Sequence, residues 1–139
     1  MGLDTTHDCW HGSYMAFGRW RNELARVAGY TVGTLSYKDG WKNEVPLVDW
    51  GHLATDETLA GKWPETPDDP LIVLIVHSDC DGCIYPEQAQ ALADRLEELL
   101  PLLPREDGGG HIGNWQDKTQ HFITGLRKAF ADYEAVEFL

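Results

Sequence analysis

The sequence has few basic residues and no long apolar run. Its 139 residues include 11 Lys and Arg against 23 Asp and Glu, which gives a net charge of −12. So acidic a surface repels phosphate backbones and therefore disfavours general binding to DNA or RNA. The longest purely aliphatic stretch is the six residues from Leu71 to Val76, whereas a membrane-spanning helix needs about 20 apolar residues. We therefore expect no membrane association.

Cysteine is also scarce. The three residues Cys9, Cys80 and Cys83 are an odd number and do not make a disulfide framework. The first residues show no basic stretch followed by an apolar one, the pattern of a secretion signal. We therefore expect a soluble, cytoplasmic protein whose cysteines are free thiols or metal ligands.

The remaining composition is that of an ordinary globular protein. Apolar residues make up 42% and charged residues 24%, which argues against disorder. A chain of this length buries about two thirds of its unfolded surface, so one domain over residues 1–139 needs no disulfide or metal to fold. Tryptophan is abundant, and both a core role and an aromatic wall for a planar ligand are open. The six are Trp10, Trp20, Trp41, Trp50, Trp63 and Trp115.

Helical spacing of apolar residues predicts three long helices. The first is expected from about Ser13, a good N-cap, to Ala28, with Gly29 ending it. A second helix begins near Pro86, which suits a first helical turn. It carries an amphipathic leucine stripe and runs to about residue 100. The third is expected over residues 115–133.

Strands are predicted mainly from apolar and β-branched runs. LIVLIVH, residues 71–77, is apolar without alternation, as in a strand buried on both faces. Shorter strands are expected over residues 2–6 and 135–139, and a hairpin over residues 30–50 with its turn at KDG. Residues 51–70 are predicted to form a long surface loop of the kind that covers a ligand, with one helical turn near residues 56–60. The pattern predicts a small α/β or α+β domain, in which about three helices cover a sheet with a buried central strand.

Three clusters of polar residues carry the candidate chemistry. HDCWHG occupies residues 7–12, HSDCDGC occupies residues 77–83, and GGGHIGN places His111 in a glycine-rich loop. If the strands before the first two clusters are parallel neighbours, both clusters leave the same edge of the sheet, where ligands bind in such folds. We therefore expect the first two loops to form one polar pocket. For the third, a flexible loop is the preferred interpretation over a phosphate cradle.

The spacing H-x-x-C-x-x-C in the second cluster is compatible with a metal site. His77, Cys80 and Cys83 would be three ligands on one loop, with His7 or His11 as a fourth, and zinc is the ion that prefers this set. The competing interpretation is a polar turn whose cysteines pack as small apolar groups. Both remain open at this point.

Two other interpretations of HSDCDGC rank lower. Asp79 and Asp81 resemble the start of a calcium loop, but the later acidic ligands are missing, so turn formation is favoured. Cys80 as a nucleophile is disfavoured because these two carboxylates flank the thiol and suppress its thiolate.

The stretches HDCWHGSYMAFGRWR and HSDCDGCIYPEQ resemble a family of small uncharacterised phage and actinobacterial proteins. Those proteins share an N-terminal H-x-C-W-x-G motif and an HSDC-[DE]-G loop before a leucine-rich helix. The resemblance brings no activity with it. It implies a site because these residues occur together in the two shared motifs. Cys83 stands where the family has an acidic or aromatic residue, which favours His77, Asp79 and Cys80 as the working groups. The implied site residues are His7, Trp10, His77, Asp79, Cys80 and Asp81.

These observations favour a protein that binds a small, nucleotide-like ligand, with or without a divalent metal such as zinc. The alternatives are a metal-assisted hydrolase of a small phosphate- or amide-containing substrate, and an acidic interaction or immunity module with a basic protein partner or a second copy of itself. Whether the protein is an enzyme stays open. The predicted ligand-binding residues are His7, Trp10, His11, His77, Ser78, Asp79 and Asp81. The predicted metal ligands are His7, His77, Asp79 and Cys80.

Overall fold

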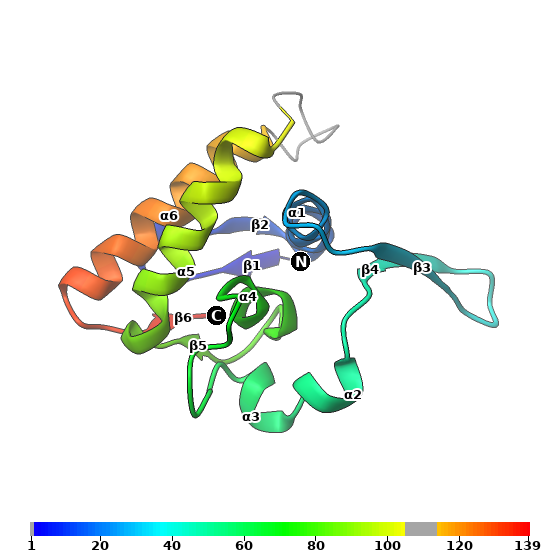
Figure 1. The fold of residues 1–139 in the computed structure, drawn as a ribbon, viewed down its shortest axis with the longest axis horizontal. Coiled ribbons are helices and arrows are strands. Elements are labelled where there is room, and N and C mark those ends of the chain that lie inside the picture. Colours follow the sequence, from blue (N-terminus) through cyan, green and yellow to red (C-terminus); the bar gives the residue numbers. More distant parts are fainter. Residues whose placement is uncertain (1, 105–113) are drawn as a thin grey trace.

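The computed structural model describes residues 2–104 and 114–139 and has an α+β fold, as the sequence predicts. Helices α5 (Pro86–Leu99) and α6 (Trp115–Ala131) lie side by side, and α1 (Tyr14–Val27) crosses beside them (Figure 1). The predicted flexible loop with its glycine run and His111 lies outside the described residues. None of the helices in the described ranges is long and apolar enough to cross a membrane.

Within residues 2–104 and 114–139, the strands form three separate antiparallel pairs instead of one sheet. The first pair joins β1 (Gly2–Asp4) to β2 (His11–Ser13), with the short 3-10 helix η1 (Thr6–Asp8) between them. The second joins β3 (Val32–Ser36) to β4 (Lys42–Pro46), and the third joins β5 (Cys83–Ile84) to β6 (Val136–Glu137). The predicted N-terminal and C-terminal strands are thereby confirmed.

Helix α1 forms where the sequence predicts it. The Ser13 hydroxyl accepts a hydrogen bond from the Ala16 amide at 3.0 Å and caps the first turn. Gly29 follows the helix with a φ of 97°, a backbone angle that residues other than glycine rarely adopt. Phe17 and Trp20 are fully buried on its inner face. The Trp20 indole donates to the Thr119 hydroxyl at 2.8 Å and ties α1 to α6.

Residues 71–76 of the predicted central strand form a helix, so that prediction is wrong. The helix α4 (Leu71–Val76) is buried at all six positions. An apolar run without alternation fits a buried helix as well as a buried strand. A strand at this place needs neighbours to pair its backbone, whereas a helix satisfies most of its own hydrogen bonds. The main neighbours of α4 are the helices α1 and α5 and the short helix α3 (Asp56–Leu59), which offer no strand edge for backbone pairing, so a helix suits this buried position.

The middle of the chain confirms the predicted hairpin and helical turn. The β3–β4 hairpin projects from the body of the protein (Figure 1). The following loop carries two single-turn helices, α2 (Trp50–Leu53) and α3 (Asp56–Leu59). The 3-10 helix η2 (Leu100–Leu102) directly follows the end of α5. The bounds of α5 and α6 agree with the prediction to within two residues.

Gly125, in the middle of α6, lets the N-terminal loop approach the helix backbone. A Cβ at this position would lie 2.4 Å from Cys9 Sγ and 2.8 Å from the His7 carbonyl oxygen. Real Cβ atoms do not come so close to backbone, so this helix and η1 depend on glycine at their contact.

We predict that Gly125→Ala destabilises the fold by about 1–3 kcal/mol, the usual cost of overpacking. The matched control is Gly18→Ala in α1, because a Cβ there has no atom within 4 Å. That change should stabilise the protein by about 0.5–1 kcal/mol, because alanine loses less chain entropy than glycine in a helix. Urea unfolding followed by circular dichroism measures both. Two changes of the same sign would contradict the close contact.

Candidate functional site

His77 occupies a buried, structural position. Its side chain packs on the Phe138 ring with 4.1 Å between centroids, and the residue is only 2% exposed. Nδ1 lies 2.7 Å from the Ser78 carbonyl oxygen, and Nε2 lies 2.8 Å from that of Cys83. Burial lowers the pKa of His77, although these two contacts partly offset the effect. Neither ring nitrogen is therefore directed to an open site where a metal or ligand would reach it.

The rest of HSDCDGC forms a turn anchored on α3. The Ser78 amide donates to the Leu59 carbonyl at 3.0 Å, and the Cys83 amide donates to that of Ala60 at 3.1 Å. Within the turn, the Ser78 hydroxyl accepts from the Cys80 amide at 3.2 Å. The Asp81 carboxylate accepts from the Gly82 amide at 2.8 Å, as turn-forming aspartates do. These contacts account for Ser78 and Asp81 as turn-forming residues.

In the HDCWHG loop, Cys9 and Trp10 belong to the core. Trp10 is 2% exposed and stacks on Trp20 with 5.1 Å between ring centroids, so it does not wall a pocket as predicted. Burial raises the pKa of the Cys9 thiol to about 12. His11 is exposed and contacts the Asp4 carboxylate across the β1–β2 pair.

The two predicted loops do not face each other across an open pocket. The C-terminal segment lies between them, with β6 placed between β1 and β5 in Figure 1. Phe138 pairs with Thr5 on one side, and on the other side its amide donates to the Gly82 carbonyl at 2.9 Å. The C-terminal segment thus connects the regions of the two loops by contacting both. The parallel neighbouring strands that the sequence suggested are not what brings these regions together.

A groove of about 630 Å³ lies between α1 and the β3–β4 hairpin. Asp79 is the predicted site residue that lines it. The hairpin is held against α1 by Asn22, whose side-chain amide donates to the Glu44 carbonyl at 3.0 Å. Arg26 pairs with the Glu44 carboxylate and strengthens this attachment. Side chains of both elements line the groove, and its width depends on these contacts.

Arg21, another lining residue, joins the groove to the buried helix α4. Its Nη1 lies 3.2, 3.3 and 2.6 Å from the carbonyl oxygens of Leu74, Ile75 and His77. These carbonyls end α4 and have no helical partner of their own. The guanidinium also lies over the Phe17 ring at 4.5 Å. Burial lowers the pKa of Arg21 to about 10, and the nearby Asp79 carboxylate offsets part of the shift. The guanidinium therefore stays positively charged at neutral pH.

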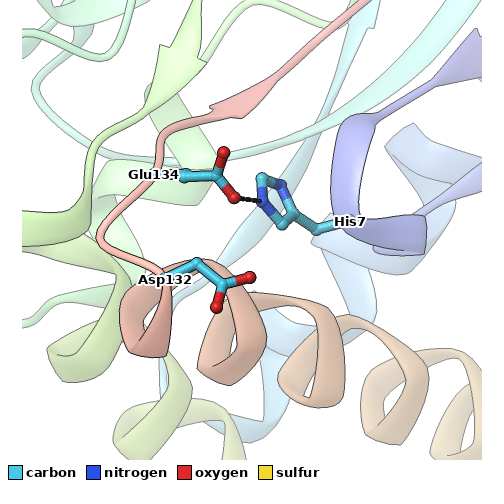
Figure 2. Close-up of side chains that lie close together, drawn as sticks. All are labelled: His7, Asp132 and Glu134. Carbon is cyan, nitrogen blue, oxygen red and sulfur yellow. Dashed lines mark hydrogen bonds and ion pairs between the residues drawn. The ribbon is translucent and has the colours of Figure 1, made fainter.

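A second cluster joins the two ends of the chain. His7 Nε2 lies 3.1 Å from Glu134 Oε1, and the Asp132 carboxylate completes a group whose atoms all lie within 4.8 Å of one another (Figure 2). His7 is a predicted metal ligand, but its partners here differ from the predicted ones. Asp132 and Glu134 have no sequence signal, because they are ordinary acidic residues more than 120 positions from His7.

No family model matches the chain, and comparisons with curated proteins and with solved structures returned no match.

We predict that Arg21→Met destabilises the protein by about 2–3 kcal/mol, because three carbonyls at the end of α4 lose a charged donor. Methionine keeps the packing on Phe17. Arg19→Met is the matched control, since Arg19 is exposed on the same helix and should change stability by no more than about 0.5 kcal/mol. Chemical unfolding of both variants tests the difference. Equal stabilities would show that Arg21 does not hold α4.

We predict that the cysteines differ in reactivity toward a thiol reagent in the folded protein. Cys80 is exposed, whereas Cys9 is buried with a raised pKa, so Cys80 should react first and Cys9 only after unfolding. Peptide mass spectrometry after timed iodoacetamide treatment identifies the modified residue. Modification of Cys9 in native protein at the rate of Cys80 would contradict the burial of the N-terminal loop.

Proposed function

We propose that the protein binds a small, planar, anionic ligand of the nucleotide type in the groove between α1 and the β3–β4 hairpin. The observation that carries the proposal is the composition of this groove, which combines aromatic and basic side chains on a strongly acidic protein. Its volume of about 630 Å³ lies within the usual range of small-molecule sites.

The charge of the groove differs from that of the whole chain. The lining includes the basic residues Arg19, Arg21 and Lys42 and the acidic residues Glu44 and Asp79. Glu44 is partly compensated by Arg26, which also pairs with Glu23. The local balance therefore favours an anion, although the protein carries a net charge of −12. A phosphate or carboxylate bound here would meet Arg19 and Lys42 at the surface, with Arg21 behind them.

Aromatic side chains supply the surface for a planar ring. Trp41 is 64% exposed and Tyr37 is 51% exposed, and both line the groove from the hairpin. Tyr14 contributes from α1, and Trp50 contributes from the start of α2. Stacking of a base on such a side chain contributes about 1–3 kcal/mol. Tyr37 and Trp41 border the same hollow, and adjacent exposed apolar side chains of this kind mark a ligand or protein site.

A protein partner is the second candidate, and the projecting hairpin favours it. Leu35, Tyr37 and Trp41 on the hairpin and Met15 on α1 are all exposed. Such apolar residues on a protruding element suit a protein interface. This candidate shares the aromatic residues of the first but does not require the basic ones.

Binding of defined probes tests the first candidate. Adenosine monophosphate and a cyclic dinucleotide should bind with dissociation constants below about 1 mM in isothermal titration calorimetry. Adenosine, which lacks the anion, and pyrophosphate, which lacks the ring, should each bind more weakly than the complete nucleotide, because each uses only half of the lining.

We predict that Trp41→Leu weakens nucleotide binding by about tenfold or more, as expected for the loss of one stacking partner. Arg19→Met should weaken it as well and reduce its dependence on salt. The control is Phe130→Leu, which changes an exposed aromatic residue on α6, away from the groove. Equal affinities of the Trp41 and Phe130 variants, or no nucleotide binding at all, would contradict the ligand proposal. Self-association of the chain or binding to another protein would then favour the second candidate.

A further inference from the structure

We infer that His7, Asp132 and Glu134 form a binding site for a divalent transition-metal ion, separate from the groove. The three side chains offer one imidazole nitrogen and two carboxylates within 4.8 Å of one another. In Figure 2, His7 extends from the N-terminal loop toward the turn that carries both carboxylates. In Figure 1, this turn lies at the opposite end of the molecule from the β3–β4 hairpin.

The His7 ring is held with Nε2 toward the carboxylates. Its side chain is only 11% exposed, and Nδ1 lies 2.9 Å from the Thr6 hydroxyl oxygen. That oxygen also accepts a hydrogen bond from the Glu137 amide at 2.9 Å, which fixes its position. Metal-bound histidines usually donate their second ring N–H to a carboxylate, carbonyl or water oxygen, which orients the ring. The contact between Thr6 and Nδ1 therefore holds the ring in an orientation that suits a metal ion bound at Nε2.

The surrounding charges favour a cation. Asp132 is the C-cap of the 17-residue helix α6, where the helix carbonyls create a negative potential. Carboxylates at this end of a helix are unfavourable unless a positive charge is close. Lys128 lies 3.4 Å from Asp132, but both side chains are well exposed, at 68% and 48%, so this pair gives weak compensation. A bound metal ion would neutralise both carboxylates and the helix end together.

The ligand set indicates the class of metal. Coordinated nitrogen and oxygen atoms lie about 3 Å apart around an ion with bonds of 2.0–2.2 Å, and the 3.1 Å between His7 Nε2 and Glu134 Oε1 fits this spacing. Asp132 is partly exposed and can rotate to complete the set. One imidazole with two carboxylates suits Mn²⁺, Fe²⁺ or Zn²⁺ better than Ca²⁺ or Mg²⁺, which prefer oxygen alone. Three protein ligands leave further positions on the ion for water.

Manganese is the sharpest probe, because Zn²⁺ has affinity for thiols and the protein has free cysteines at positions 80 and 83, whereas Mn²⁺ prefers oxygen and nitrogen ligands. Mn²⁺ should be titrated into the tag-free, ¹⁵N-labelled full chain. We predict saturable paramagnetic broadening of the amide signals around residues 7 and 132–134. Zn²⁺ should displace Mn²⁺, and Mg²⁺ at tenfold higher concentration should not.

Three variants locate the ion. Glu134→Gln should weaken Mn²⁺ binding at least tenfold, and its amide keeps a polar contact to His7, so the fold is preserved. Glu137→Gln, the same change at an exposed residue of β6, is the control and should change the affinity less than twofold. Lys128→Met should strengthen binding, because it removes the ammonium that competes for Asp132.

The inference is overturned if Mn²⁺ broadens no signals near His7 at millimolar concentration. It is also overturned if Glu134→Gln and Glu137→Gln weaken binding equally. That result would mean that the general negative charge of this surface attracts the ion, without coordination by Glu134. Mg²⁺ competing as well as Zn²⁺ would show that the imidazole takes no part.

Discussion

The burial of α4 is the constraint on which the rest of the structure depends. Its six residues are enclosed by other helices, so the backbone groups at its two ends cannot rely on water. At the N-terminal end, the Asp69 carboxylate accepts from the Leu71 amide at 3.0 Å. At the C-terminal end, the Arg21 guanidinium meets three carbonyls. An apolar helix in the core is possible here because one acidic and one basic side chain bind backbone groups at its two ends.

These two end contacts also organise the surrounding elements. Asp69 accepts from the Tyr30 hydroxyl at 2.7 Å and from Arg95 Nε at 3.0 Å, and so connects α4 to the start of the hairpin and to α5. Burial alone would raise the pKa of the Asp69 carboxyl group. The hydrogen bonds from Tyr30, Arg95 and Leu71 outweigh this effect and bring the pKa below its usual range. Arg21 reaches α4 from α1 and borders the groove. The residue that supports the core thus supplies part of the positive charge of the proposed ligand site.

Local signals predicted the parts of the fold that depend on local physics. Ser13 and Gly29 bound α1, Pro86 begins α5, and KDG turns the hairpin, because caps and turns act within a few residues. The run at 71–77 was predicted incorrectly because its apolar pattern lacks a period, and only its neighbours decide between strand and helix. His77 and Trp10 have the composition of a site but pack in the core. The contacts of Arg21 with α4 and of His7 with Glu134 span 53 to 127 positions, and no local pattern encodes them.

The two proposed sites use opposite local fields on one acidic protein. The groove gathers basic side chains of α1 and β4, whereas the His7 cluster gathers carboxylates at the negative end of α6. Salt screens exposed charges beyond about 10 Å at 0.1 M, so the net charge of −12 does not dictate what either site attracts. The immediate neighbours decide instead: Arg26 pairs with both Glu23 and Glu44 beside the groove, and the exposed Lys128 compensates Asp132 only weakly. Both assignments therefore follow from contacts between individual residues, which the composition of the chain conceals.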